Sequence, residues 1–262
     1  MDGLKEERDI SRKRLEDHYA KKYIQDAHEG GIETIPLVAY PSSRFEAAIK
    51  NLLESQVGGD VLELGAGNGV IAKTLLEVLP GIASYTATEI SAPRLKSMGD
   101  NIRDPRLRVI PLDAENLQGM EEGGFDLIIM IALIEHLVDP LGAMGRLRKL
   151  LKPGGAVYID TPNIAKYTRR LKLMLGRFPS TASSAEGLIT YEGREVDLFD
   201  EGHLHYYTYR SLSAMLVRRC GFSRVRKFVS PGGGSPFGKH LGYAMAKAWP
   251  EMFSDVVILA YA

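Results

Sequence analysis

The alternation of two hydrophobic patterns is the clearest feature of residues 43–160. Short continuous apolar runs alternate with longer stretches in which apolar residues recur at helical spacing. Continuous apolar strands separated by helices are typical of a parallel sheet that helices cover on both faces. The pattern therefore predicts an α/β fold, with strands at 60–64, 84–89, 107–112, 125–131 and 156–160 and helices at 43–56, 69–79, 92–102 and 140–151.

The two ends of the chain follow other patterns. Residues 4–29 are highly charged, and their apolar residues are spaced as in one or two N-terminal helices. After Pro162 comes a segment, 163–205, that is poor in strand signals and carries a basic, partly amphipathic stretch at 166–177. The chain then predicts helices at 207–219 and 241–249 and strands at 222–229 and 255–261.

These elements predict three parts. Residues 1–40 form an N-terminal helical cap, and residues 41–162 and 206–262 form a doubly wound domain around a mostly parallel, seven-stranded sheet. Residues 163–205 form a lid-like insertion after the fifth strand, because uninterrupted segments of this length are usually functional. The Lys-Pro-Gly-Gly sequence at 152–155 predicts a turn before that strand.

Composition adds a few limits. Of the 262 residues, 45% are apolar and 25% are charged, as in a soluble globular protein with a substantial core. The net charge is zero, which disfavours a dedicated nucleic-acid binder. The single cysteine, Cys220, cannot form an internal disulfide and is expected to pack in the core. No signal segment or membrane-spanning run is evident, which predicts a cytoplasmic protein without stable membrane insertion.

A glycine-rich turn follows the first strand. Residues 61–69 read Val-Leu-Glu-Leu-Gly-Ala-Gly-Asn-Gly, so a strand runs into Gly65, Gly67 and Gly69 and a helix follows. Glycines let the backbone turn tightly and approach a ligand, and the start of the helix adds free N–H groups that suit a carboxylate or a phosphate. The dinucleotide fingerprint needs its third glycine one position later, where this chain has Val70. The spacing therefore disfavours a nicotinamide-dependent oxidoreductase, which stays an alternative.

Acidic residues stand at the ends of the next two strands. Glu89 closes the second strand about twenty residues after the glycine turn, where an acid can accept hydrogen bonds from ribose hydroxyls. Asp113 follows the third strand and could accept a hydrogen bond from an adenine amino group. Ligands of such sheets bind outside the carboxyl ends of the strands, so both side chains are expected beside the glycine turn.

In order and spacing, these motifs and the segments 131–137 and 150–155 resemble the class I S-adenosylmethionine-dependent methyltransferases. Within that family they are similar to the group that includes the ubiquinone-biosynthesis methyltransferases, and the resemblance covers residues 40–160 well. It implies a Rossmann-like domain with S-adenosylmethionine as cofactor, in which Glu63 and the glycine turn hold its amino-acid end. The residues expected to bind the cofactor are Glu63, Gly65, Ala66, Gly67, Asn68, Gly69, Glu89, Ile90, Asp113, Ala114 and Ile131.

Three histidines are candidates for the chemistry on the acceptor. Methyl transfer is an in-line displacement, so the protein must align the acceptor and, for a hydroxyl, remove a proton. Histidine suits that role near neutral pH, and the predicted catalytic residues are His136, His203 and His205. No metal site is expected, because no nearby Cys/His set completes a metal motif. The residues expected to bind the acceptor are Tyr19, Tyr23, Leu133, Tyr206 and Tyr207.

The identity of the acceptor stays open. The apolar segment 131–134 lacks the Asn/Asp-Pro-Pro-Tyr/Phe motif of DNA-adenine methyltransferases, which favours a small molecule, with oxygen as the preferred acceptor atom. The alternatives are a protein or RNA methyltransferase and a cofactor-binding scaffold without catalysis. The basic stretch at 166–177 is best interpreted as a lid helix. The alternatives are that it contacts a phosphate-bearing acceptor or a membrane surface. A homodimer is compatible with the sequence.

Overall fold

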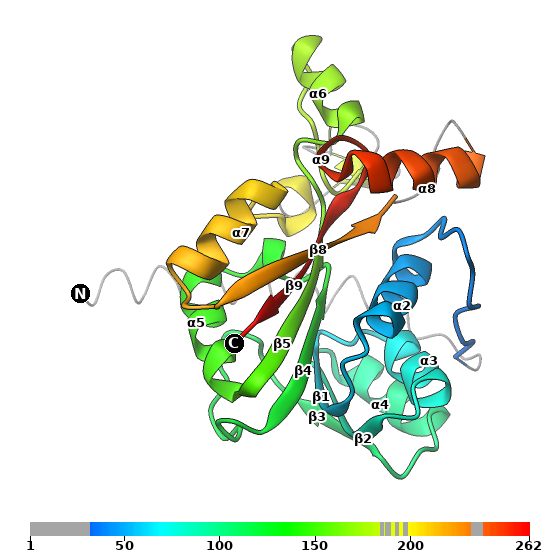
Figure 1. The fold of residues 1–262 in the computed structure, drawn as a ribbon, viewed down its shortest axis with the longest axis vertical. Coiled ribbons are helices and arrows are strands. Elements are labelled where there is room, and N and C mark those ends of the chain that lie inside the picture. Colours follow the sequence, from blue (N-terminus) through cyan, green and yellow to red (C-terminus); the bar gives the residue numbers. More distant parts are fainter. Residues whose placement is uncertain (1–31, 184–185, 187–189, 192–193, 196–198, 232–237) are drawn as a thin grey trace.

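The computed structural model describes residues 32–183, 186, 190–191, 194–195, 199–231 and 238–262. Within them, a seven-stranded sheet has the strand order β3-β2-β1-β4-β5-β9-β8 (Figure 1). The N-terminal helices predicted at 4–29 lie outside the described residues. The strands of the sheet are β1 Gly59–Leu64, β2 Ile82–Glu89, β3 Leu107–Pro111, β4 Phe125–Ile131, β5 Leu151–Thr161, β8 Arg224–Ser230 and β9 Asp255–Tyr261.

Helices cover both faces of the sheet because side chains of alternate residues in each central strand point to opposite faces. On one face, Leu62 and Leu64 of β1 pack in a cluster with residues of α5 Pro140–Leu150 and α7 Tyr209–Arg218. On the other, Val61 packs in a cluster with residues of α2 Arg44–Ser55, α3 Val70–Val78 and α4 Ala92–Asn101. Figure 1 shows the two groups of helices on either side of the sheet.

The strand directions create a crevice at the carboxyl edge of the sheet. β1 pairs in parallel with both β2 and β4, and the pairs β2–β3 and β4–β5 are also parallel. β9 is antiparallel to both of its neighbours, β5 and β8. The prediction of a mostly parallel, Rossmann-like sheet is thus confirmed. The strand order reverses between β1 and β4, which is where such sheets bind ligands.

The largest departure from the predicted strand boundaries lies at residues 151–155. The Lys-Pro-Gly-Gly sequence predicts a turn before a strand at 156–160, whereas β5 already begins at Leu151 and pairs there with Phe125. The register shifts between Phe125 and Leu127, and Gly154 has a left-handed φ of 82°. The four residues therefore form an irregular start to the strand, since a bulge absorbs residues that a regular ladder cannot pair.

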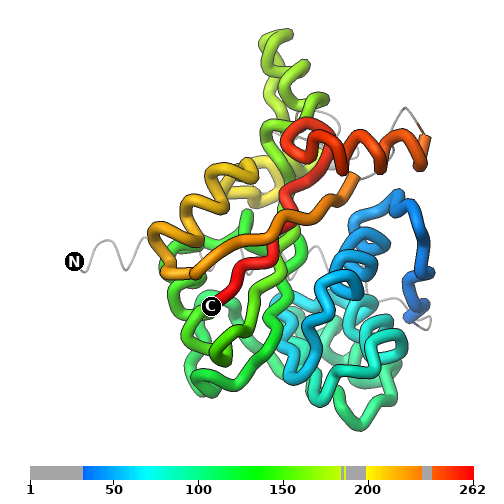
Figure 2. The backbone as a smooth tube through the Cα atoms, viewed as in Figure 1, coloured from blue at the N-terminus to red at the C-terminus, as the bar shows by residue number. Residues whose placement is uncertain are grey.

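The described part of the insertion contains α6 Tyr167–Met174, a hairpin of β6 Thr190–Tyr191 and β7 Arg194–Glu195, and the 3-10 turn η2 Phe199–Gly202. The sequence did not predict the hairpin. α6 projects beyond the sheet near α8 Gly238–Ala248 and α9 Pro250–Phe253 (Figures 1 and 2), and the Tyr167 and Phe253 rings lie 5.4 Å apart. α9 was not predicted either.

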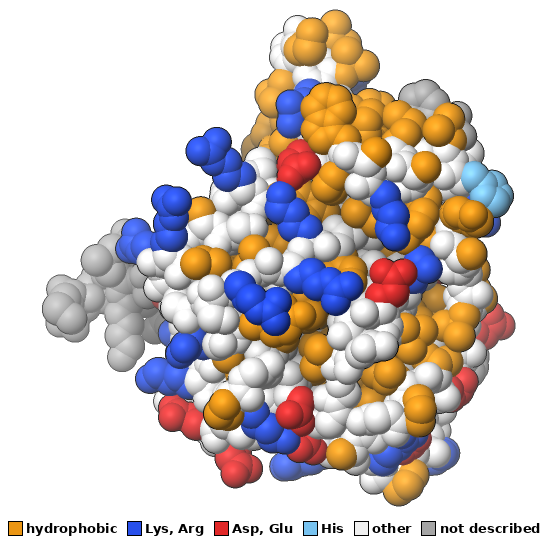
Figure 3. Space-filling model, viewed as in Figure 1, with side chains coloured by type: hydrophobic (Ala, Val, Ile, Leu, Met, Phe, Trp, Pro, Cys, Tyr) orange, Lys and Arg blue, Asp and Glu red, His pale blue; other side chains and the backbone are white. Residues whose placement is uncertain are grey.

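The projecting helix α6 has no buried residue. Its Leu171, Leu173 and Met174 are exposed, and hydrophobic atoms gather at this end of the molecule (Figure 3). Among the described residues, no helix has the length and apolar character that crossing a membrane requires. Whether α6 acts as a lid stays a prediction.

Candidate active site

The glycine turn between β1 and α3 has backbone angles that glycine adopts readily and other residues rarely do. Gly65, Gly67 and Gly69 have φ values of 65°, 59° and 83°. A Cβ atom on Gly69 would lie 2.3 Å from Cγ of Met98, so this glycine allows α4 to approach. Among the described residues, a Cβ atom on Gly67 would meet only Nη1 of Arg94 within 4 Å, at 3.5 Å. Apart from Arg94, the described part of the chain therefore leaves the space beside the Gly67 backbone open.

Glu89 ties the end of β2 to this turn. Its Oε2 accepts a hydrogen bond from the Gly67 N–H at 3.0 Å, and its Oε1 accepts from the N–H groups of Ile90 at 2.8 Å and Ser91 at 3.1 Å. Nη1 of Arg94 lies 3.9 Å from Oε2. Gly67 and Glu89 are 22 residues apart in the sequence, and they meet at the carboxyl edge of the sheet as expected.

Glu63 lies inside the protein below the turn. It is 3% exposed, and its Oε2 accepts a hydrogen bond from the Tyr85 hydroxyl at 2.8 Å. Burial raises the pKa of Glu63 to about 8, against the lowering effect of the Tyr85 hydrogen bond, and the nearby Glu89 carboxylate adds to the rise. At neutral pH this carboxyl is therefore mostly protonated, unless a cationic group comes close to it.

The remaining residues that were predicted to bind the cofactor lie around the same edge. Ala66 donates its N–H to the Thr88 carbonyl at 2.8 Å, and Oδ1 of Asn68 accepts from the Val70 N–H at 3.4 Å. Oδ1 of Asp113 accepts from the Glu115 N–H at 2.7 Å, so this carboxylate also caps its own loop. Ala114 is buried, Ile131 is half-buried and Ile90 is exposed.

Three potential ligand side chains converge after β4, at the turn η1 Ile134–His136. Proton- or metal-binding atoms of Glu135, His136 and His203 lie within 4.8 Å of one another, and the two imidazole rings meet edge to face with centroids 4.6 Å apart. Glu135 is buried, its Oε2 accepts from the Thr161 hydroxyl at 2.8 Å, and its Oε1 has no hydrogen-bond partner among the described residues. This group, named here the Glu-His-His group, can accept a proton or hold a divalent cation.

The insertion reaches this group through backbone contacts. The N–H groups of Leu204 and His205 both donate to the Glu135 carbonyl, at 2.8 and 3.1 Å. Nδ1 of His136 lies 3.0 Å from the Gly202 carbonyl oxygen, and because a carbonyl only accepts, Nδ1 carries the proton. The sequence identified both histidines as candidates, but Glu135 was not among the predicted site residues.

The other residues predicted for the acceptor side, including His205, lie in different surroundings. The Tyr206 hydroxyl donates to Oδ2 of Asp200 at 3.0 Å, while Tyr207 is buried in the core beside α5 and α7. Leu133 packs on the same core, and a Cβ atom on Gly65 would lie 3.3 Å from its Cδ1. His205 is half-buried, and no group of three ligand side chains among the described residues includes it. Two further predicted residues, Tyr19 and Tyr23, lie outside the described residues.

A buried cluster of charges at the end of β5 was missed by sequence reasoning. Asp160 is fully buried with Nε of Arg44 3.1 Å from its Oδ1. Burial raises the pKa of Asp160 to about 7, and the attraction of Arg44 opposes this rise. Asp255 of β9 lies 3.6 Å from Nη1 of Arg169 and 3.8 Å from Nζ of Lys166. These contacts join the start of the insertion to the sheet.

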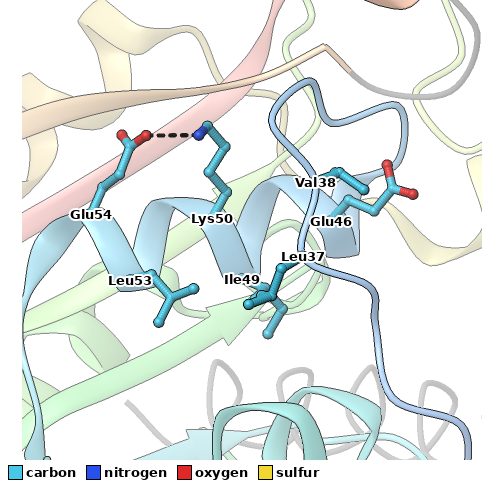
Figure 4. Close-up of a pocket in the computed structure, with 7 residues that line it drawn as sticks. All are labelled: Leu37, Val38, Glu46, Ile49, Lys50, Leu53 and Glu54. Atoms are coloured by element: carbon cyan, nitrogen blue, oxygen red, sulfur yellow. Dashed lines mark ion pairs between the residues drawn. The ribbon is translucent and has the colours of Figure 1, made fainter. Parts of the chain in front are cut away.

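A cavity of about 250 Å³ lies elsewhere, between α2 and the segment that precedes it (Figure 4). Four of its seven lining side chains are apolar, and an ion pair of Lys50 and Glu54 lies at one side, where Nζ and Oε1 are 3.2 Å apart. None of the predicted site residues lines this cavity, which is formed by Leu37, Val38, Glu46, Ile49, Lys50, Leu53 and Glu54.

A family model described as a methyltransferase domain matches residues 40–227 of the chain. A ubiquinone biosynthesis O-methyltransferase of Acinetobacter baumannii is 27% identical over 119 residues, which are 43% of this chain and 49% of that protein. The highly reducing polyketide synthase sthA of Phaeosphaeria nodorum is 35% identical over 117 residues, 42% of this chain and 4% of the synthase. The matched segment therefore spans no more than about half the length of these relatives.

Solved structures with the same fold include an S-adenosylmethionine-dependent methyltransferase from Mesorhizobium loti. It is 18% identical with a TM-score of 0.56, and the alignment covers 83% of this chain and 97% of that one. The carbon methyltransferase of CurJ is 22% identical with a TM-score of 0.51, and the alignment covers 82% of this chain and 52% of that one. At these identities the likeness shows the fold alone.

The buried Glu63 predicts a specific pH dependence of stability. Its folded-state pKa of about 8 lies above the ordinary 4.5, so Glu63 costs no stability below pH 4.5 and costs progressively more as the pH rises towards 8. Gln at this position stays uncharged and can still accept from Tyr85. Relative to Glu63→Gln, the wild type is expected to lose about 2–4 kcal/mol of unfolding free energy between pH 5 and pH 8, measured by urea denaturation.

The exposed Glu121 supplies the control, because Glu121→Gln removes an equal charge from the surface. Its stability curve is expected to run parallel to that of the wild type over the same pH range. Parallel curves for Glu63→Gln and the wild type would contradict the assignment of a raised pKa to Glu63.

Proposed function

Because this chain belongs to the class I S-adenosylmethionine-dependent methyltransferases, we propose that it transfers the methyl group of the cofactor to an oxygen atom of a small molecule. The observation that carries the proposal is the contact of Gly67 with Glu89 at the ends of β1 and β2, next to the point where the strand order reverses between β1 and β4. Gly65 of the same turn lies against Leu133, which directly precedes the turn η1. Cofactor residues and the Glu-His-His group thus share one edge of the sheet.

The glycine turn has the properties that the cofactor requires. The open face of Gly67 admits a ligand to the backbone, where a Cβ atom would intrude. N–H groups at the start of α3 suit the carboxylate of an amino acid, and the Glu89 carboxylate is an acceptor suited to ribose hydroxyls. Bound near Glu63, the ammonium group of the cofactor would favour the charged form of that carboxyl.

The Glu-His-His group is the proposed acceptor of the proton. When bound, S-adenosylmethionine supplies a methyl group on a sulfonium that is already a good leaving group. As the bond from the acceptor oxygen to the methyl carbon forms and the carbon–sulfur bond breaks, the O–H proton moves to an imidazole of His136 or His203. The buried Glu135 carboxylate, 1% exposed, stabilises the imidazolium that results.

The relatives support a small acceptor and divide over its reacting atom. The Acinetobacter relative is named as an O-methyltransferase, whereas the CurJ structure is named as a carbon methyltransferase. A carbon acceptor is therefore the second candidate, and the same imidazoles would remove a proton from an acidic C–H group. A protein or RNA acceptor has less support, because the chain has no net positive charge.

Calorimetric titration with S-adenosylmethionine, S-adenosylhomocysteine and NAD tests the cofactor. We expect binding of the first two with dissociation constants of about 1–100 μM and no heat from NAD. An acceptor screen with phenols, quinones, sugars and carboxylic acids follows, with methylated products identified by mass spectrometry. Absence of binding by both S-adenosyl compounds would reject the proposal and leave the scaffold alternative.

The Gly67→Arg variant tests the glycine turn itself. The long side chain would fill the open space beside Gly67, so we expect binding of S-adenosylhomocysteine to weaken at least about a hundredfold. Gly154→Arg is the matched control. Gly154 also has a left-handed φ, of 82°, and a Cβ atom on it would meet none of the other described residues within 4 Å, but it lies at the start of β5. Equal affinities of the two variants would remove Gly67 from the site.

Replacement of the histidines tests the acceptor side. We expect His136→Ala and His203→Ala to lower turnover about a hundredfold or more while the affinity for S-adenosylhomocysteine changes less than about threefold. His205→Ala removes an imidazole outside the Glu-His-His group and is expected to cost less turnover. Wild-type turnover in both of the first two variants would contradict the assignment.

Dialysis against EDTA separates proton transfer from metal assistance. If an imidazole takes the proton, turnover is expected to be unchanged by the chelator. Loss of turnover that Mg²⁺ or Zn²⁺ restores would instead assign the Glu-His-His group to a cation.

A further inference from the structure

Asp200 is a fully buried acid in the insertion that none of the steps above uses. Among the described residues, its carboxylate accepts four hydrogen bonds: from the Ser180 hydroxyl, from the N–H of Thr181 at 3.1 Å, from the hydroxyl of Thr181 at 3.2 Å and from the Tyr206 hydroxyl at 3.0 Å. An ionised carboxylate can only accept hydrogen bonds, and this arrangement of donors suits such a group. Donors from three residues therefore hold Asp200 in place inside the insertion.

One of these bonds continues to the Glu-His-His group. Oγ1 of Thr181 lies 2.6 Å from Nδ1 of His203 as well as 3.2 Å from Oδ2 of Asp200. The threonine hydroxyl has a single proton, and the carboxylate has none to give. If the hydroxyl donates to the carboxylate, it can only accept from His203, which must then carry its proton on Nδ1.

The backbone at Asp200 directs the second histidine. Asp200, Glu201 and Gly202 have φ values of 46°, 56° and 81°, three left-handed residues in succession. Such a run is costly for non-glycine residues and persists only where the surrounding contacts hold it. It presents the Gly202 carbonyl to Nδ1 of His136 at 3.0 Å. The same short turn thus contacts Nδ1 of His136 directly and Nδ1 of His203 through Thr181.

We propose that Asp200 is a positioning residue that, through Thr181, keeps the proton of His203 on Nδ1 and leaves Nε2 as the basic nitrogen. The inference rests on the proposed function, in which an imidazole of this group takes the acceptor proton. Only the direction Thr181 to Asp200 makes both contacts hydrogen bonds, because the hydroxyl then donates to the carboxylate at 3.2 Å and accepts from the Nδ1–H of His203 at 2.6 Å. In the opposite direction the threonine oxygen and the carboxylate oxygen would face each other with no proton between them. The logic is that of a carboxylate that fixes a histidine tautomer, here with a hydroxyl between the two.

The tautomer of His203 can be read directly by ¹⁵N NMR of the full chain labelled with ¹⁵N-histidine. Long-range proton–nitrogen correlations at pH 8 report which ring nitrogen carries the proton, and the His203→Gln variant assigns the signals. The wild type is expected to hold the proton on Nδ1. In Thr181→Val, which removes the hydroxyl, the ratio of the Nδ1–H form to the Nε2–H form is expected to fall about tenfold.

Three variants separate positioning from packing. Thr181→Ser keeps the hydroxyl and is expected to restore the wild-type ratio. Ser180→Ala removes a different donor from the same carboxylate, outside the path to His203, and is expected to leave the ratio unchanged. Asp200→Asn removes the charge and is expected to lower the ratio in the same direction as Thr181→Val.

An Nε2–H form in the wild type, or an unchanged ratio in Thr181→Val, would overturn the inference. Titration of each variant with S-adenosylhomocysteine keeps this outcome distinct from failure of the proposed function. If the wild type does not bind S-adenosylhomocysteine, the proposed function is rejected. The ratio of the two His203 tautomers tests the role of Asp200 without any substrate.

Discussion

The burial of both faces of β1, β4 and β5 is the constraint on which the site depends. Because both faces of these strands are buried, a slip of one residue would move every side chain into the packing site of another on the opposite face, which a closely packed core does not tolerate. In the observed register Leu64 pairs with Met130, and Ile131 pairs with Asp160. The three strands consequently end at nearly the same level, and the glycine turn, η1 and Thr161 follow at one edge.

That edge carries more charge than a buried region normally tolerates. Taking a carboxylate out of water costs several kcal/mol unless opposite charges and hydrogen bonds compensate. Burial affects the pKa values of two acids differently: Asp160, near the end of β5, and Asp255, at the start of β9. Burial raises the pKa of Asp160 towards neutrality, while at Asp255 the effect of burial is outweighed by Lys166, Arg44 and Arg169, which hold its pKa low. The cations that start the insertion thus compensate an acid of the sheet, which fixes where α6 leaves it.

The cofactor half of the site could be predicted from sequence because it is encoded locally. A strand, a glycine turn and a helix are adjacent in the chain, and the parallel topology then requires Glu89 to arrive beside Gly67. The Glu-His-His group could be predicted only in part. His136 follows β4 directly, but His203 arrives from an insertion whose path no hydrophobic period specifies, and the left-handed Asp200 has no sequence signal.

One backbone carbonyl joins the insertion to the Glu-His-His group. The carbonyl oxygen of Glu135 accepts hydrogen bonds from the N–H groups of both Leu204 and His205, so both of its lone pairs hold the insertion to η1. The side chain of the same residue is joined through Oε2 to Thr161 at the end of β5. Any displacement of the insertion from the sheet must therefore disturb the residue that gathers the two histidines. The position of Glu135 determines both how the insertion docks on the sheet and how the two histidines are placed. A change in one is therefore expected to change the other.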